Sequence, residues 1–437
     1  MKSLVITAPS SGNGKTTMTL GIIRALKKKG LDVCGYKVGP DYIDKAFLEK
    51  ASGKPAGNLD LHLQGERGLR YSLSQASSEI CVIEGVMGYF DGIYNTFQNS
   101  TYDVSQKLHL NSVLIYTPKG EMFTTIPKIK GMVDFKNSGI RGVIYNNVSA
   151  YYYSLLKEAT EQHLDIEVLG FMPKIDDIEL KSRYLGLIQS VEIENLEQVI
   201  EITASAIEQH VDLEALIGLM VEVPTDHRPS LLPEIPQNKL TVAIAHDEVF
   251  SFYYKENIEL FETFTNVKTF SPISDQTIPE CDLLYLVGGY PEVHFQALSQ
   301  NQSMLRSIKN FGEAGGHIFA ECGGMMYLTE SIENTPMVGL FKGGSHLTDK
   351  LQRFGYIDVT INQDCLIGKK GDRLTAHEFH KSVTQVDAPM VFDIQKTMGT
   401  KEWQCGYQYK NIIAGYPHFN FLGNMRMFQS LLTAISK

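Results

Sequence analysis

The feature that most constrains this chain is a glycine-rich turn set between an apolar run and a helical segment. Residues 4–7 are apolar and β-branched, residues 8–17 form the turn, and residues 18–29 carry apolar side chains at helical spacing. Glycines leave backbone N–H groups free to face an anion, and the start of a helix adds partial positive charge. The order strand, turn, helix therefore predicts a phosphate-binding loop in an α/β domain.

The polar side chains of this turn have roles that follow from their chemistry. Lys15 supplies a point charge for the β- and γ-phosphates of a nucleotide, and the Thr16 hydroxyl can ligate Mg²⁺. The loop is a deviant form, because Pro9 stands where a first glycine is usual and Ser10 stands where partition-type ATPases carry a second lysine. A plain strand-to-helix turn is the alternative. The candidate ATP-binding residues of the loop are Gly12, Asn13, Gly14, Lys15, Thr16 and Thr17.

Two further predicted strands end in charged residues. One ends in Glu84, with Asp91 in the glycine-containing turn beyond it; the other leads into Lys37, followed by Asp41 and Asp44 around a Gly-Pro turn. Ligands of parallel sheets bind at the carboxyl ends of the strands. Glu84 is therefore the candidate Mg²⁺ ligand, and the segment after Lys37 can bind an anionic substrate group and a metal together. A turn without further function explains Asp91 and the Gly-Pro-Asp sequence equally well.

Short β-branched runs alternate with longer helical segments through the first half of the chain. This pattern predicts a mostly parallel sheet with right-handed crossovers. Four of the 16 prolines fall in residues 221–238, which predicts a semi-rigid linker. We therefore predict an α/β fold with domains at residues 1–220 and 239–437, the second also an α/β pattern that runs to the end. The predicted strands of the first domain are residues 4–7, 33–36, 80–83, 113–116, 142–145 and 168–170.

The second predicted domain contains a cysteine at a strand-to-helix turn. Cys322 follows an apolar run and precedes two glycines and a helical segment, which is the arrangement of a nucleophile elbow. A sharp turn would expose the sulfur, and the helix N-terminus would lower the pKa of the thiol. His418, in a strand-like run, is the candidate base, whereas a buried structural thiol is the alternative. The candidate donors to an oxyanion are the backbone N–H groups of Gly288, Gly289 and Gly323.

Composition excludes several classes of partner. The formal net charge of -10 argues against a global nucleic-acid surface, and no apolar run approaches the roughly 18 residues of a membrane span. The first residues are too short and too uncharged for a signal peptide. The six cysteines lack CxxC pairs, and His377 and His380 are three residues apart without a second metal motif nearby, so we expect reduced thiols and no zinc site. These features predict a cytoplasmic protein without nucleic-acid or membrane partners.

Together these motifs resemble the cobyrinic acid a,c-diamide synthases, glutamine-dependent amidotransferases of cobalamin biosynthesis. The N-terminal half is similar to dethiobiotin-synthetase-like ATPases, and the C-terminal half to class I glutamine amidotransferases of the cobyric acid synthase type. The resemblance covers nearly the whole chain. It rests on residues 9–17, 37–44, 58–60, 84–92, 183–187, 250–254, 288–292, 320–328 and 377–380.

The resemblance implies ATP- and glutamine-dependent amidation of the a and c carboxylates of a corrinoid, through an acyl phosphate and ammonia released from glutamine. It implies Mg²⁺ as the cofactor, with ATP, glutamine and a tetrapyrrole polycarboxylate as ligands. Cys322 and His418 would be the glutaminase pair, and Asn146 would read the adenine. It places Lys15 and Thr16 at the ATP phosphates, Thr16, Glu84 and Asp41 around the metal, and Lys37, Asp41, Asp44 and Asp91 near the reacting carboxylate.

Three questions stay open at this stage. Many class I glutaminases carry an acid two residues after the histidine, but Asn420 stands there, so His418 must be oriented by Asn420, a backbone carbonyl or an acid elsewhere. The macrocycle could instead be metal-free hydrogenobyrinic acid or nickel sirohydrochlorin. A partition-type ATPase switch, in which nucleotide controls dimerisation, would explain the first half of the chain but would leave Cys322 and His418 without a role.

Overall fold

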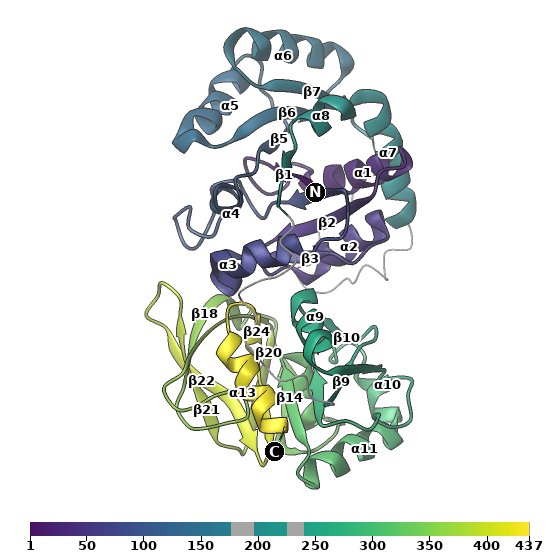
Figure 1. Cartoon of the computed structure of the whole chain (residues 1–437), viewed down its shortest axis with the longest axis vertical. Helices are drawn as coiled ribbons and strands as arrows, with labels where there is room; N and C mark the ends of the chain where they lie inside the picture. Colours follow the sequence, from purple (N-terminus) through teal and green to yellow (C-terminus); the bar gives the residue numbers. More distant parts are fainter. Residues whose placement is uncertain (176–195, 225–239, 437) are drawn as a thin grey trace. The chain divides into compact units, whose positions relative to one another are not determined.

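The computed structural model describes residues 1–175, 196–224 and 240–436 of the chain (Figure 1). The chain forms two compact units, one of Met1–Leu61 with Glu66–Pro229 and one of His62–Gly65 with Ser230–Lys437. Residues 183–187 and most of the predicted linker lie outside the described residues.

The first unit is built on a parallel sheet in the order β3-β2-β4-β1-β5-β6-β7. The predicted strands fall on six of these seven, and the mostly parallel arrangement is confirmed. Val221–Glu222, at the start of the predicted linker, is instead a short strand, β8, that pairs antiparallel with β1. The other strands are β1 (Lys2–Thr7), β2 (Val33–Val38), β3 (Gly57–Leu59), β4 (Ile80–Glu84), β5 (Ser112–Tyr116), β6 (Ile140–Asn146) and β7 (Glu167–Met172).

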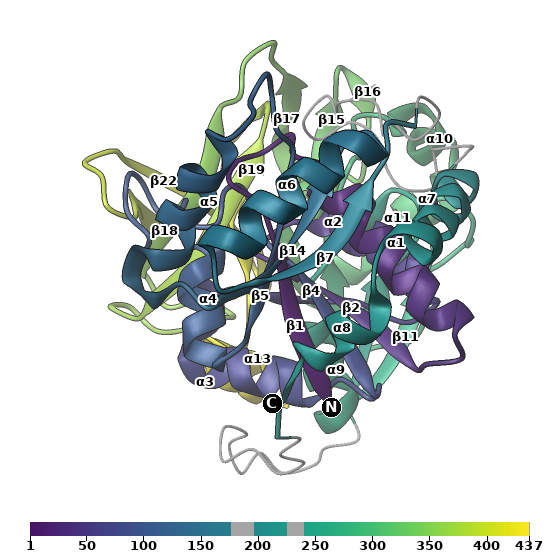
Figure 2. The ribbon, with the colours of Figure 1, turned by 90° about the horizontal axis from the view of Figure 1, so that it is seen from above.

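Helices cover both faces of this sheet (Figure 2). Alternate residues of β1 show why: Leu4 and Ile6 pack with α1, α2 and α7, whereas Val5 packs with α3 and α4. A sheet buried on both faces needs apolar residues in both directions, which is why its strands read as continuous apolar runs. The helices are α1 (Lys15–Lys28), α2 (Tyr42–Ser52), α3 (Leu61–Ser74), α4 (Thr101–Leu108), α5 (Thr125–Asp134), α6 (Ala150–His163), α7 (Leu196–His210) and α8 (Leu213–Gly218), with a 3₁₀ turn at Phe135–Asn137.

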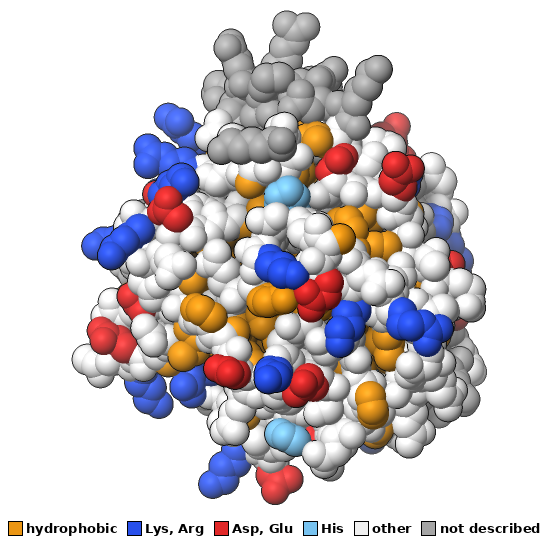
Figure 3. Space-filling view, turned by 90° about the horizontal axis from the view of Figure 1, so that it is seen from below, with side chains coloured by type: hydrophobic (Ala, Val, Ile, Leu, Met, Phe, Trp, Pro, Cys, Tyr) orange, Lys and Arg blue, Asp and Glu red, His pale blue; other side chains and the backbone are white. Residues whose placement is uncertain are grey.

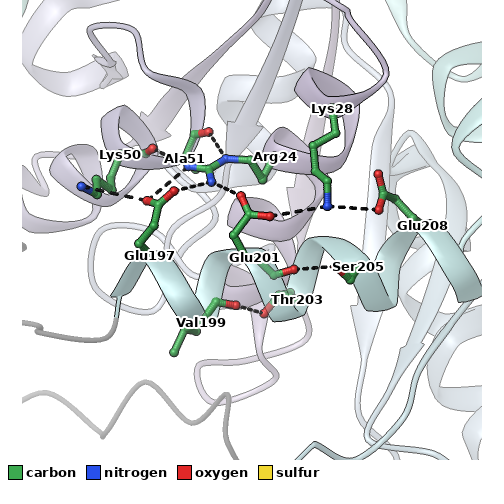
Figure 4. Close-up of polar contacts among 10 residues, drawn as sticks. All are labelled: Arg24, Lys28, Lys50, Ala51, Glu197, Val199, Glu201, Thr203, Ser205 and Glu208. Atoms are coloured by element: carbon green, nitrogen blue, oxygen red, sulfur yellow. Dashed lines mark hydrogen bonds and ion pairs between the residues drawn. The ribbon is translucent and has the colours of Figure 1, made fainter.

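A buried arginine ties three of these helices together (Figure 4). The Arg24 guanidinium, on α1, pairs with Glu197 at 2.6 Å and with Glu201, both on α7. It also donates to the backbone carbonyls of Ala51 and Lys50, each at 3.0 Å, where α2 ends. Helix α1, which begins in the phosphate loop, is therefore fixed to α2, which carries Asp44. It is also fixed to α7, which lies more than 160 residues later in the sequence.

The second unit contains a mixed sheet in the order β11-β9-β12-β14-β23-β22-β21-β18-β19-β24. The first five strands are parallel, and antiparallel pairing begins at β22. The strands of this sheet are β9 (Thr241–Ala245), β11 (Asn266–Phe270), β12 (Leu283–Leu286), β14 (His317–Glu321), β18 (Arg353–Ile361), β19 (Arg373–His380), β21 (Met390–Lys396), β22 (Glu402–Tyr409), β23 (Ile412–Gly415) and β24 (His418–Phe419).

The prediction that an α/β pattern continues to the end of the chain is wrong for its middle part. Between α12 (Gly323–Leu328) and α13 (Met425–Ile435), the chain forms strands and turns without a helix. Antiparallel pairing needs no helical crossover, so this part extends the parallel core as hairpins. The remaining helices are α9 (Lys255–Phe264), α10 (Phe295–Gln300) and α11 (Gln302–Glu313), and the smaller sheets use β10 (Phe250–Phe252), β13 (Gly288–Gly289), β15 (Thr329–Ile332), β16 (Thr335–Pro336), β17 (Phe341–Leu347) and β20 (Ser382–Val386).

The surface in Figure 3 mixes charges of both signs. Lysine and arginine side chains are interspersed with aspartate and glutamate on this face, with apolar atoms showing between them. Such a face differs from the single-sign surface that binds nucleic acid. Among the described helices, none combines the length and the apolar character needed to cross a membrane.

Candidate active sites

The predicted phosphate loop joins β1 to α1 through two glycines in the left-handed region. Gly12 has φ of 78° and Gly14, the N-cap of α1, has φ of 81°. A Cβ atom on Gly14 would lie 2.4 Å from Nδ2 of Asn146, so a side chain is excluded by both conformation and space. A Cβ atom on Gly12 would meet no atom within 4 Å. The backbone thus has the strand, turn and helix that the sequence predicts.

Asn146, at the end of β6, braces this loop. Its Nδ2 donates to the backbone oxygen of Asn13 at 3.0 Å and to Oγ1 of Thr117 at 3.2 Å. Asn13 in turn donates from Nδ2 to the backbone oxygen of Ser10 at 3.0 Å. The structure therefore brings Asn146 to the loop, as expected, but through the loop backbone. A contact with adenine stays a prediction.

The Lys15 ammonium is directed to a neighbouring turn. Its Nζ donates to the backbone oxygen of Met87 at 2.7 Å. Burial, and then the positive charge of Lys37, lowers the pKa of Lys15 to about 8, while Glu84, Asp44 and Asp91 act in the opposite direction. Lys15 therefore lies within electrostatic reach of these four charged side chains, which brings the predicted phosphate and substrate residues into one region.

Lys37 lies between two of the predicted carboxylates. Its Nζ is 2.8 Å from Oδ2 of Asp44 and 2.9 Å from Oε1 of Glu84, and it donates to the backbone oxygen of Gly85 at 3.1 Å. Lys37 and Glu84 are register partners on the adjacent parallel strands β2 and β4. Burial disfavours the charge on Lys37, but Asp44 and Glu84 outweigh it and raise its pKa. The ammonium is therefore held in its charged form.

Glu84 has the properties of a metal ligand. Its Oε1 accepts a hydrogen bond from Oγ1 of Thr16 at 2.5 Å, and its Oε2 is buried without a hydrogen-bond partner among the described residues. The described residues contain no group of three or more His, Cys, Asp and Glu arranged to hold a metal. Mg²⁺ beside a nucleotide needs only one or two carboxylates, because phosphates and water supply its other ligands. Thr16 and Glu84 fit that requirement.

Asp41 and Asp91 each close a local turn. Oδ1 of Asp41 accepts from the backbone N–H groups of Ile43 and Asp44, both at 2.9 Å, and so caps α2. Oδ2 of Asp91 accepts from the backbone N–H of Gly88 at 3.0 Å. The turn interpretation of these acids is therefore seen directly, and contacts with metal or substrate stay predictions.

Cys322 occupies the predicted elbow between β14 and α12. Its φ of 45° and ψ of -106° are strained for a residue with a side chain. Its backbone N–H donates to the oxygen of Gly415 at 2.7 Å, at the end of the neighbouring strand β23. The elbow is thus fixed next to the chain that leads, three residues later, to His418.

The predicted exposure and acidity of this thiol are wrong. Cys322 is 6 % exposed, and burial, followed by the negative charge of Glu292, raises the pKa of its thiol. Withdrawal from water disfavours the thiolate more than a single six-residue helix can favour it. The thiol therefore stays protonated until a base accepts its proton.

His418 and the predicted oxyanion glycines lie beside this elbow. A Cβ atom on Gly288 would lie 2.4 Å from Cε1 of His418, and one on Gly323 would lie 2.7 Å from the backbone oxygen of Gly289. The pair of glycines in β13 therefore approaches both the imidazole and the elbow, and a side chain at Gly288 would displace the ring. Burial, and then the positive charge of His380, lowers the pKa of His418 to about 3, so its imidazole is neutral.

The strand that carries His418 is held by Glu321, a glutamate to which no sequence motif assigns a role. Oε1 of Glu321, the residue before Cys322, accepts from the backbone N–H of Phe419 at 3.0 Å, and its Oε2 accepts from the Tyr285 hydroxyl at 2.9 Å. Burial raises the pKa of Glu321 to about 8. Asn420, in contrast, uses Oδ1 to accept from the backbone N–H of Leu422 at 3.0 Å. An acid inside an apolar strand was the only sequence signal for Glu321.

Two further histidines flank His418. His377 is its register partner across β19 and β24, with ring centroids 5.0 Å apart, and its Nδ1 lies 3.0 Å from the Tyr254 hydroxyl. The His380 ring stacks on Tyr416 at 3.6 Å. Both histidines lie on a strand, so their spacing does not place them on one helical face.

Two protein-family models match the chain in the order of its two units. Residues 4–187 match a CobQ/CobB/MinD/ParA nucleotide binding domain, and residues 241–425 match a CobB/CobQ-like glutamine amidotransferase domain. The prediction of a nucleotide-binding half followed by a glutamine amidotransferase half is confirmed by these matches.

Curated relatives match over the whole length. The cobyrinate a,c-diamide synthase of Clostridium tetani is 46% identical over 440 residues, covering 99% of this chain and 100% of the relative. Those of Clostridium acetobutylicum and Methanocaldococcus jannaschii are 43% and 36% identical, each over 99% of this chain and over 100% and 99% of the relative.

Proposed function

Because the chain belongs to the cobyrinate a,c-diamide synthase family, we propose that it amidates the a and c carboxylates of cobyrinic acid. Membership makes the chain a glutamine-dependent amidating ligase with a nucleotide-binding half. The full-length identity of 46% to such a synthase carries the choice of substrate. The amidation of hydrogenobyrinic acid or of nickel sirohydrochlorin remains the second candidate, because no described contact distinguishes the macrocycles.

The phosphate loop fits the activation step of this reaction. A carboxylate is a poor electrophile, so its oxygen first attacks the γ-phosphorus of ATP, forming an acyl phosphate and releasing ADP. Lys15 would leave the Met87 carbonyl and pair with the phosphate oxygens. Thr16 and Glu84 would hold Mg²⁺, which when bound neutralises phosphate charge. Ammonia then attacks the acyl carbon, and inorganic phosphate leaves.

The elbow in the second unit fits release of that ammonia from glutamine. His418 would take the proton of the Cys322 thiol as its sulfur attacks the amide carbon, and would pass the proton to the departing ammonia. Backbone N–H groups at Gly289 and Gly323 would stabilise the oxyanion. Water then hydrolyses the γ-glutamyl thioester to glutamate. Burial raises the pKa of the Cys322 thiol and lowers that of His418 to about 3, so both groups start in their neutral forms.

We place this reaction in the cytoplasm, where thiols stay reduced. The six cysteines, including Cys322, lie outside any disulfide. Mg²⁺ and ATP would bind the first unit, whereas glutamine would bind the second.

The experiment that tests the substrate is mass spectrometry of reaction mixtures. Cobyrinic acid, hydrogenobyrinic acid and nickel sirohydrochlorin are each incubated with ATP, Mg²⁺ and amide-¹⁵N glutamine. Two ¹⁵N-labelled amides on cobyrinic acid, with slower or no labelling of the others, are expected. Labelling of another macrocycle instead would move the proposal to that substrate, and ATP-driven dimerisation without any amide product would favour the partition-type switch.

A further inference from the structure

The carboxylate expected to bind Mg²⁺ already has a cation beside it, supplied by the chain itself. Lys37 is 3 % exposed and Glu84 is fully buried, and their charged groups are 2.9 Å apart. The same ammonium is 2.8 Å from Asp44. Two buried carboxylates without a countercharge would be costly, so Lys37 stabilises them when no metal is present.

Only one of the two carboxylate oxygens of Glu84 has a polar contact with another described residue in this arrangement. Thr16 and Lys37 both contact Oε1, whereas Oε2 is buried and lacks a hydrogen-bond partner among the described residues. The orphan oxygen is a place for a further cation or donor. A divalent cation bound there would share one carboxylate with the Lys37 ammonium, and the two positive charges would repel each other.

Nucleotide phosphates change that balance. They would bring several negative charges to the loop at Gly12–Lys15, adjacent to Thr16, and so supply the counter-ions that two neighbouring cations require. Lys15 lies in the same region, since its pKa responds to Lys37, Glu84 and Asp44. Without phosphates, the two carboxylates and the two lysines already compensate one another.

We propose that Lys37 is an internal counter-ion that blocks Glu84 and Asp44 to free Mg²⁺ until the metal arrives with ATP. This inference rests on the proposed function only in taking Glu84 as the metal ligand. Metal entry loosens the contact of Lys37 with Glu84 and makes its ammonium available to the anionic group of the substrate. The ion pairs of Lys37 thereby impose an order of binding, in which nucleotide and metal enter together and substrate follows.

The test measures Mn²⁺ binding by electron paramagnetic resonance, with Mn²⁺ as the spectroscopic substitute for Mg²⁺. The wild-type chain should bind Mn²⁺ at least about tenfold more weakly without nucleotide than with a non-hydrolysable ATP analogue. Lys37→Met keeps the apolar stem but removes the charge. This variant should bind one Mn²⁺ per chain without nucleotide, and Mn²⁺ should raise its melting temperature by several degrees while leaving that of the wild type unchanged.

Two further variants separate this effect from a general change in charge. Lys54→Met removes a lysine that pairs with Asp32 and Ser78 beyond the C-terminal end of α2, and it should gain no Mn²⁺ site. Lys37→Met combined with Glu84→Gln should lose the site that Lys37→Met alone gains.

Equal Mn²⁺ affinity of the wild type with and without nucleotide would overturn the proposal, and this measurement needs no variant if Lys37→Met fails to fold. A folded Lys37→Met chain that gains no Mn²⁺ site would overturn it as well. Neither measurement uses tetrapyrrole or glutamine, so its outcome is independent of whether cobyrinic acid is the substrate.

Discussion

At the phosphate loop, ionised side chains stand in pairs, whereas burial around Cys322 shifts the titratable groups toward their neutral forms. Lys37 contacts Asp44 and Glu84 directly, and its pKa is raised. In the second unit, burial raises the pKa of Glu292 to about 7 and that of Glu321 to about 8, and lowers that of His418 to about 3. Direct ion pairs thus keep Lys37 charged in the first region, whereas burial favours the neutral forms of acids and histidine in the second.

The difference matches the two kinds of chemistry. Phosphoryl transfer is governed by charge on oxygen atoms, so a site of paired ions can exchange its own countercharges for those of phosphate and metal. Thiol chemistry moves one proton between sulfur, imidazole and ammonia, so a site of neutral groups avoids leaving a lone buried charge. Substitutions that act on one region but not on the other test this contrast.

The largest effect is expected from Cys322→Ala. Loss of the only proposed nucleophile should reduce glutamine-supported amidation by at least about 10³-fold. Amidation supported by ammonium salts should stay unchanged, because the phosphate loop is untouched. The two rates are measured on the same preparation, with Cys281→Ala as the control for loss of a thiol in the same unit. Failure of ammonium to support turnover would show that Cys322 does more than hydrolyse glutamine.

Lys15→Met should impair the phosphate loop and leave the glutaminase site intact. Amidation should fall by about 10²–10³-fold with either nitrogen donor, since the positive charge that pairs with transferring phosphate is lost. Glutamine hydrolysis, followed as glutamate release, should persist. Lys28→Met, in the last turn of the same helix, provides the matched control. A wild-type rate of amidation in Lys15→Met would remove Lys15 from the phosphate site.

Glu321→Ala should give a smaller loss, confined to the glutaminase. Without the acceptor for Phe419 N–H, the strand of His418 loses a tether next to Cys322, and glutamine hydrolysis should fall about ten- to hundredfold. Glu321→Gln should stay within about threefold at pH 7, because an amide resembles the neutral acid that a pKa of about 8 favours there. Ammonium-supported amidation should not change in either variant. Equal losses in both variants would contradict a positioning role through this acceptor.

The last expected effect is on stability and its dependence on pH. The pKa of Lys15 falls from 10.5 to about 8 in the folded chain, so between these values the unfolded chain binds more protons and wild-type stability rises with pH. Well below pH 8 the buried charge costs its full amount, about 3 kcal/mol. Lys15→Met should therefore be more stable than wild type at pH 7, and the gap should close toward pH 10.5. Urea denaturation at several pH values measures it, and a constant gap would contradict the shift.

The sequence predicts the strands of the first unit well, because each buried parallel strand is a short apolar run that can be recognised locally. Buried parallel strands are apolar throughout, so β1, β2 and β4 to β7 stand out, and the strand ends bring Lys37 and Glu84 to one edge. Their direct pairing depends on β2 lying next to β4, and strand order is not local information.

The second site is harder to predict because its properties arise from packing. The pairing of Cys322 with His418 is a prediction from motif alone, and the rise in the thiol pKa depends on how deeply the elbow is covered. The contact between Glu321 and Phe419 joins residues 98 apart in sequence. The hairpins after α12 also escape prediction, because half-exposed antiparallel strands mix polar and apolar residues with no helix to punctuate them.

The ion pairs of Arg24 in Figure 4 show that the segment matched by the nucleotide-binding family model is shorter than the unit that packs together. The nucleotide-binding match ends at residue 187, whereas both carboxylate partners of Arg24 lie on α7, which begins at Leu196. Trimming the chain to the match would remove both carboxylates that pair with the Arg24 guanidinium and uncover the apolar side of α1. Any attempt to transplant this nucleotide-binding module should therefore carry α7 with it.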